Sequence, residues 1–175
     1  IVTPAALRRL CEHLKENPQT GAVAPQLLLA DGSPQPYGFG GDPALPYLWR
    51  RGWQRLLHRR ALHDWGDRHR AQVDWVSFAC VAISRRAWRT IGPLDETYFM
   101  YFEDNDWCLR ARQKKWHIER LPSAQIIHHG GAGLKQSPRA AQAYRRSLKY
   151  FYRKHYTRPA RLLLALLLPL YAKCR

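Results

Sequence analysis

Acidic residues are scarce in this sequence, and their scarcity restricts the partners that the protein can have. The 175 residues include 13 Asp and Glu against 29 Lys and Arg, which gives a formal charge of +16. Such a surface favours polyanions: nucleic acid, phosphorylated small molecules or an anionic membrane face. Net charge alone does not choose among the three.

Cysteine is also scarce, with four residues, and no pair has a CxxC spacing. No cluster of histidines completes a zinc site with them. We interpret the four as reduced thiols of a cytosolic protein, with Cys80 and Cys108 in the core.

Long apolar runs are missing too. The best candidate, Leu162 to Ala172, is interrupted by Pro169, and a membrane span needs about 20 residues. The preceding basic segment, 139–158, is interleaved with aromatics, as at a membrane interface. The alternative is a C-terminal helix packed on the domain.

The sequence begins at Ile1 without a methionine or a signal peptide, directly before a helix start at Thr3-Pro4. We therefore expect a fragment whose N-terminal part is missing.

Caps, apolar spacing and turn residues predict alternating strands and helices. Helices are expected from Pro4 to Asn17, from Arg85 to Ile91, from Glu103 or Asp104 to Lys115, from Pro138 to about Tyr156, and after Thr157. Strands are expected at 22–30, 73–84, 117–122 and 124–129, and segment 34–72 is expected to be irregular with a short amphipathic helix. This alternation favours an α/β fold with a mixed sheet.

Three of the few acids stand together as Glu103, Asp104 and Asp106. At the start of a helix, the dipole and free N–H groups should keep a carboxylate ionised, as a general base requires. Glu103 and Asp106 share a face, while Asp104 projects about 100° away. The alternative is structural: acids are ordinary in a first turn, and Asp106 can pair with Arg110.

Two other features accompany the acids. The aromatic run 98–102 offers an apolar approach to them, with rings that suit either sugar faces or a core. His128 and His129 end a predicted strand just before glycines, a usual position for metal ligands, although a histidine pair by itself is often incidental.

Together, in this order, these pieces resemble a known family. "PQLLLADGSPQP", "VSFAC", "RRAW", "IGPLDETYFMYFEDNDWCLR" and "IIHHGGAG" are similar to the C-terminal half of family 2 inverting glycosyltransferases, closest to rhamnosyltransferase-like enzymes of bacterial cell-surface polysaccharide synthesis. The resemblance covers roughly residues 1–150 and implies the acceptor-binding half of a glycosyltransferase-A, Rossmann-like fold. The nucleotide-binding half, with its metal-binding Asp-x-Asp motif, would be absent.

The resemblance also implies roles for individual residues. Asp104 matches the catalytic base, and Glu103 would orient that base or bind the acceptor. Trp75 and Ser77 would face the acceptor; Asp106 is assigned to acceptor binding as well, although an anchoring role through Arg110 is the stronger expectation. His128, with His129 as the fallback, would complete a site for a divalent metal, Mg²⁺ or Mn²⁺, that neutralises the leaving diphosphate.

The expected function is transfer of a deoxyhexose or hexose from a nucleotide-sugar to a glycan or lipid-linked acceptor. Localisation is expected at the cytoplasmic face of the inner membrane, on an anionic surface, with no nucleic-acid partner. We expect residues 1–156 to belong to the catalytic domain and 157–175 to form an apolar C-terminal helix.

One residue departs from the family, since Phe78 stands where Gly is common, and its ring would narrow the acceptor pocket. Two alternatives stay open: a basic nucleic-acid-binding module and a non-catalytic membrane-peripheral scaffold.

Overall fold

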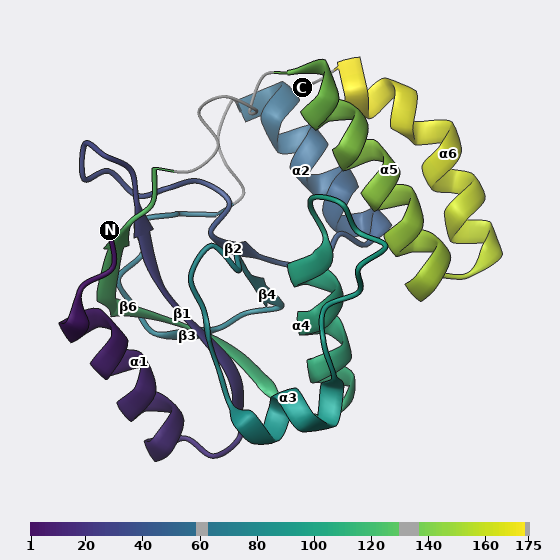
Figure 1. Cartoon of the computed structure of the whole chain (residues 1–175). Coiled ribbons are helices and arrows are strands. Elements are labelled where there is room, and N and C mark those ends of the chain that lie inside the picture. Colours follow the sequence, from purple (N-terminus) through teal and green to yellow (C-terminus); the bar gives the residue numbers. More distant parts are fainter. Residues whose placement is uncertain (59–62, 130–136, 174–175) are drawn as a thin grey trace. The chain divides into compact units, whose positions relative to one another are not determined.

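The computed structural model describes residues 1–58, 63–129 and 137–173 (Figure 1). The chain forms two compact units. The first comprises Ile1–Gly41, Trp65–Asp95 and Glu103–Ala132, and the second comprises Asp42–Asp64, Glu96–Phe102 and Gly133–Arg175. The domain boundary expected at residue 156 stays a prediction.

The first unit holds a sheet and three helices. Its elements are α1 (Pro4–Glu16), β1 (Thr20–Leu28), β2 (Phe39–Gly40), β3 (Ala71–Gln72), β4 (Trp75–Val76), β5 (Ala82–Ile83), α3 (Arg85–Ile91), α4 (Glu103–Gln113) and β6 (His117–Ile127). The second unit contains α2 (Leu45–His58), α5 (Pro138–His155) and α6 (Arg158–Lys173). The predicted α/β class with C-terminal helices is confirmed.

The main sheet has the strand order β3-β6-β1-β5. β1 pairs with β6 in parallel and with β5 antiparallel, and β3 pairs antiparallel with β6. The sheet is therefore mixed, as the sequence predicted. β2 and β4 form a separate antiparallel pair.

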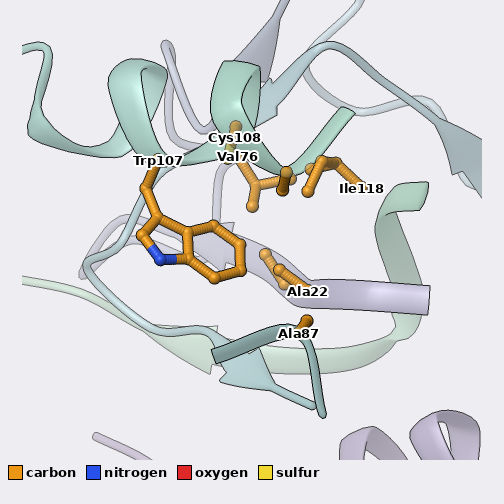
Figure 2. Close-up of a cluster of buried hydrophobic side chains, with 8 residues drawn as sticks. Ala22, Val76, Ala87, Trp107, Cys108 and Ile118 are labelled. Atoms are coloured by element: carbon orange, nitrogen blue, oxygen red, sulfur yellow. The ribbon is translucent and has the colours of Figure 1, made fainter. Parts of the chain in front are cut away.

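β1 is buried on both faces, which explains its nearly continuous apolar sequence. Ala22 and Ala24 pack with Trp107 and other residues of α3 and α4 (Figure 2). Val23 and Leu27 pack against α1 through Leu10 and its neighbours. The first unit is therefore layered, with α1 on one face of the sheet and α3 with α4 on the other.

Local capping chemistry sets several helix ends. The Thr3 hydroxyl accepts from the Ala6 amide at 3.2 Å, and the Ser137 hydroxyl accepts from the Ala140 amide at 3.1 Å, each with proline at the next position. Ser84 occupies the expected N-cap of α3, but its side chain makes no capping hydrogen bond. Gly92 ends α3 with φ of 86°, a conformation that suits glycine.

Two strand predictions were wrong. The apolar run 73–84 forms two short strands, because a turn after Ser77 sends β4 to pair with β2 and β5 to pair with β1. The Ser77 hydroxyl accepts from the Ala79 amide at 3.3 Å in that turn.

The two strands expected between 117 and 129 are one strand, β6, whose pairing with β1 shifts register beside Pro25. The register shift lies at Pro25 of β1 and leaves Pro122 of β6 out of the pairing, so the strand continues past the proline that had suggested a break. The predicted Gly-rich loop covers residues 130–136, which lie outside the described residues.

The helices of the second unit have distinct faces. α5 buries Leu148, Phe151 and Tyr152, and the Tyr152 hydroxyl donates to the Pro43 carbonyl at 2.6 Å. α6 packs on both α2 and α5. Among the helices of the described part of the chain, none combines the length and the apolar character that a membrane crossing requires.

Candidate active site

Asp104 lies in the first turn of α4, as the sequence predicted, and is partly buried. The Asn105 amide donates to Asp104 Oδ1 at 2.8 Å, and the backbone amide of Phe78 also hydrogen-bonds to this carboxylate. These backbone donors fix the carboxylate relative to both α4 and the turn after β4. The side chain is therefore held in place before any substrate binds.

The sequence predicted that the helix start would keep Asp104 ionised, and this prediction was wrong because the pKa of Asp104 is raised. Burial, followed by the nearby negative charge of Glu103, raises the pKa of Asp104 to about 7, and the backbone amides oppose that rise without cancelling it. The helix terminus alone would have kept the group ionised well below neutral pH. A carboxylate with a pKa near 7 is nevertheless well matched to general-base chemistry, since it is partly ionised yet basic.

Asn105 is a member of this site that the sequence analysis missed. It is buried, and one orientation of its amide satisfies both neighbours: Nδ2 then donates to Asp104 Oδ1 at 3.2 Å, and Oδ1 accepts from Trp75 Nε1 at 3.2 Å. A buried asparagine between two acids was the available signal, because buried amides need partners.

Glu103 begins α4 beside Asp104. One of its carboxylate oxygens, Oε2, is buried and has no hydrogen-bond partner within the described residues. A buried carboxylate oxygen without a donor is costly, and a substrate hydroxyl would remove that cost. This geometry suits the expected role of Glu103 in binding the acceptor or orienting the base.

Asp106 does not fit acceptor binding, and that assignment is corrected. Its side chain is fully buried and pairs with Arg110, with 2.8 Å between Oδ2 and Nε. Arg110 also donates to the carbonyls of Ile91 and Pro93 at 2.8 and 2.9 Å. Asp106 therefore ties α4 to the end of α3, the anchoring role that its spacing from Arg110 had suggested.

The turn before α4 is unusual. Tyr101 and Phe102 both have positive φ, at 68° and 72°. A non-glycine residue in this conformation costs roughly 1–2 kcal/mol, and such strain concentrates at functional sites. Within the second unit, the ring of Phe102 packs on Tyr144 and Phe151 at centroid distances of 5.1 and 5.6 Å, which offsets the strain.

The aromatic run before the acids serves mainly as packing, one of the two uses that the sequence had left open. Tyr98 and Phe102 are buried in the second unit, and Tyr98 meets Tyr150 edge-on at 4.8 Å. Phe99 is different, because 85% of it is exposed. Of the described aromatics in this run, Phe99 offers the most surface to a ligand.

Trp75 and Ser77 lie on and just after β4. The Trp75 indole N–H lies within hydrogen-bond distance of the Gly41 carbonyl, at 3.0 Å, and of the Asn105 amide. Asn105 in turn hydrogen-bonds to Asp104, so Trp75 is linked to Asp104 through Asn105. Ser77 immediately precedes Phe78, whose amide contacts Asp104. The Phe78 ring packs on buried Trp107 at 5.7 Å, so a ring at this position contributes to the core.

His128 follows the last residue of β6 and lies in the first unit. Its Nδ1 is 2.9 Å from Gln35 Oε1. Since an amide oxygen only accepts, Nδ1–H donates to it, and Nε2 of the neutral ring then has a lone pair free, the arrangement in which metal-binding histidines are usually held. His129 is exposed.

One suitable histidine does not complete a metal site. Within residues 1–58, 63–129 and 137–173, no three His, Cys, Asp or Glu side chains are grouped so that they could hold a metal ion. His128 fits a metal as a single ligand, and no group of three such side chains among these residues includes it.

Sequence comparison shows which known proteins the chain is similar to. The chain is 27% identical over 158 residues, 85% of its length, to N-acetylglucosaminyl-diphospho-decaprenol L-rhamnosyltransferase of two Mycobacterium tuberculosis strains. It is 35% identical over 57 residues, 33% of its length and 19% of the relative's, to low-salt glycan biosynthesis hexosyltransferase Agl10 of Haloferax volcanii. No family model and no solved structure matches.

These relatives confirm the resemblance to rhamnosyl- and hexosyltransferases. The chain spans about half the length, 50%, of the mycobacterial relatives. Assignment to family 2 stays a prediction.

Proposed function

We propose that the protein transfers a deoxyhexosyl or hexosyl group from a nucleotide-sugar to a hydroxyl of a glycan or lipid-linked acceptor, with inversion at the anomeric carbon. The observation that carries the proposal is Asp104, a partly buried carboxylate fixed by two backbone amides at the start of α4. The similarity to a rhamnosyltransferase whose name specifies a lipid-diphosphate acceptor supports it.

In the proposed reaction, ionised Asp104 takes the proton of the acceptor hydroxyl. The oxygen attacks the anomeric carbon as the proton leaves, so a new C–O bond forms on the face opposite the donor's diphosphate. The bond to the diphosphate breaks and its electron pair leaves with the nucleotide. Glu103 hydrogen-bonds the acceptor through the oxygen that otherwise has no partner.

A divalent metal, Mg²⁺ or Mn²⁺, would stabilise the charge of the leaving diphosphate when bound. His128 would hold it through Nε2, with Gln35 fixing the ring. The remaining ligands would come from the donor diphosphate and from parts of the whole protein outside the described residues.

The pH dependence of transfer tests the role of Asp104. Because the base acts in its ionised form and its pKa is about 7, kcat/KM of the whole protein should fall about tenfold for each pH unit below about 7. The measurement is initial-rate transfer over a pH series with a lipid-linked acceptor. A rate that is flat down to pH 5 would show that a different group accepts the proton.

We also propose that the second unit docks on an anionic membrane surface, at the cytoplasmic face of the inner membrane. Trp49 and Trp53 of α2 are 62% and 52% exposed and stack on one another with centroids 5.9 Å apart. On α6, Leu162 and Leu166 are 68% and 73% exposed. Exposed basic residues on α5 accompany them: Arg139, Arg145, Arg146, Lys149, Arg153 and Lys154.

The charges and the apolar groups favour the same partner. Each basic residue near an anionic surface contributes about 1 kcal/mol of attraction. Tryptophan prefers the headgroup region, where its ring is apolar and its N–H can still hydrogen-bond. A surface that combines basic side chains with exposed tryptophan and leucine is typical of a protein that binds a lipid interface.

Vesicle binding tests this surface. Replacing both Trp49 and Trp53 with Ala should weaken binding to phosphatidylglycerol-rich vesicles about tenfold or more, since two inserting rings are lost. Co-sedimentation at low and high salt measures it. Trp88→Ala is the matched control, because Trp88 is also exposed and has arginine neighbours but lies in the first unit.

Two other outcomes separate the alternatives. Equal binding by the double variant and the control would remove α2 from the interface. Displacement of the vesicles by a single-stranded oligonucleotide, with a steep salt dependence, would favour the nucleic-acid-binding alternative instead.

A further inference from the structure

A chain of hydrogen bonds leads from the β2–β4 pair to Asp104. The single N–H of the Trp75 indole is shared between the Gly41 carbonyl, 3.0 Å from Nε1, and Asn105 Oδ1, 3.2 Å from Nε1 in the amide orientation that satisfies both neighbours of Asn105. Asn105 Nδ2 in turn donates to Asp104 Oδ1 at 3.2 Å, the oxygen that also accepts from the Asn105 backbone amide at 2.8 Å. One residue thus supplies Asp104 with both a backbone and a side-chain donor.

Trp75 is held in place by its strand partner. Gly40 lies opposite Trp75 in the β2–β4 pair. A Cβ on Gly40 would lie 3.0 Å from Trp75 Nε1 and 3.2 Å from the neighbouring ring carbons. A side chain at position 40 would therefore displace the indole by a few tenths of an ångström, and glycine lets it approach the backbone more closely.

The indole determines which way the Asn105 amide points. An indole N–H only donates, so it selects the amide oxygen as its partner. The amide nitrogen then faces Asp104 and can only donate to it. Reversing the amide would set oxygen against carboxylate and nitrogen against indole N–H, leaving both contacts repulsive.

We infer that Asn105 is a positioning residue for Asp104, and that Trp75 fixes the direction in which it donates. The backbone amide of Asn105 lowers the pKa of Asp104 against the effects of burial and of Glu103. A side-chain donor to the same carboxylate stabilises its ionised form further. The hydrogen-bonding role stands on the geometry alone. Its catalytic consequence rests on the proposed function.

The charged side chains of the surrounding elements pair with other groups or are exposed, so the orienting side-chain hydrogen bond to Asp104 is assigned to Asn105. Among the described residues, Asp74 pairs with Arg112, and Asp106 pairs with Arg110. On β6, Glu119 is bound by His13 and Arg70. Four further arginines on β6 and α3 lie elsewhere or are exposed. The guanidinium of Arg120 lies over the Phe39 ring, and Arg85, Arg86 and Arg89 are exposed. Glu103 is the charge that acts on Asp104.

The test is a carboxyl ¹³C NMR titration of the 175-residue chain. Replacing Asn105 with Leu should move the Asp104 midpoint upward by about 0.5–1 pH unit, because one neutral hydrogen bond to the charged form is lost. Gln113→Leu, an exposed change on the same helix, should leave the midpoint unchanged. An unmoved midpoint in Asn105→Leu overturns the inference.

A second variant covers the case in which Asn105→Leu does not fold. Trp75→Phe keeps an aromatic ring but removes the indole N–H, so the amide is no longer oriented and the Asp104 midpoint should again rise. An unchanged midpoint in Trp75→Phe would show that the indole does not set the direction of the amide.

Kinetics in the whole protein separate this inference from the proposed function. If Asp104 is the base, the acid limb of the kcat/KM profile moves with the NMR midpoint in Asn105→Leu. A shifted midpoint with an unshifted kinetic profile would leave the positioning role of Asn105 intact and remove the base role of Asp104.

Discussion

Replacing Asp104 with Asn is expected to abolish sugar transfer and, at the same time, to make the fold more stable at alkaline pH. The loss of transfer should be at least about 100-fold, because an amide cannot accept the acceptor's proton. Binding of the nucleotide-sugar should be retained, since the proposed base acts on the acceptor. Transfer assays and donor titration with the whole protein measure the two effects.

The gain in stability follows from the sign of the pKa shift. The pKa of Asp104 is about 7 in the folded protein, above the value of about 3.9 expected when unfolded. Protonated Asp104 therefore adds stability that is fully present below about pH 4 and is lost as the pH rises through about 7. Asparagine stays neutral and avoids that loss.

Urea unfolding of the chain measures the stability effect. Asp104→Asn should raise the free energy of unfolding by about 1–3 kcal/mol at pH 8 and by close to nothing at pH 4. Asp31→Asn is a control of opposite sign, because hydrogen bonds from the Ser33 hydroxyl and amide lower the pKa of this exposed carboxyl.

The two parts of this prediction fail separately. If Asp104→Asn still transfers sugar, Asp104 is not the catalytic base, whatever the effect of the substitution on stability. Equal stability of the two proteins at pH 8 would show that Asp104 is hydrated in the folded state, which would contradict the account of its burial.

Truncating Trp107 is expected to have the largest effect on stability. Trp107 is fully buried, packs with Val76, Ala22 and Ala87 (Figure 2), and donates from Nε1 to the Gly92 carbonyl at 3.0 Å. Trp107→Ala should lower the free energy of unfolding by about 3–5 kcal/mol, through lost burial and the cavity left behind.

Trp107→Phe separates packing from hydrogen bonding at this position. It keeps an aromatic ring but leaves the Gly92 carbonyl without this donor, so it should cost less than Trp107→Ala. Chemical denaturation of both variants measures the difference. If the free energy of unfolding of Trp107→Ala lies within about 1 kcal/mol of that of the unsubstituted chain, the core between α4 and the sheet is not packed as described.

The sequence predicted the helices well because their signals are local. Threonine or serine followed by proline marks the starts of α1 and α5, and Gly92 marks the end of α3. The strands were predicted less well, because pairing is decided by distant partners. Nothing within 73–84 shows that β4 pairs with β2 while β5 pairs with β1.

At the candidate site, the sequence predicted Asp104 and Glu103 in the first turn of a helix, where the structure has them, but it misjudged the environment of their neighbours. Asp106 was assigned to the acceptor and proved fully buried against Arg110. Asn105 was passed over, although it joins Trp75 to Asp104. Both errors concern neighbouring residues of one helix. The sequence does not show in which direction each side chain points or which residues of other elements it contacts.

By itself, the sequence determined that the acids stand in the first turn of a helix, that a histidine follows a strand, and that the chain resembles glycosyltransferases. Tertiary structure alone decided that Asp104 has a raised pKa, because desolvation depends on what packs around a group and not on its neighbours along the chain. It also decided that Trp75, 30 positions away from Asn105 in sequence, orients the amide that holds Asp104. Local rules place a carboxylate on a helix, and only the packed fold sets how strongly it holds its proton.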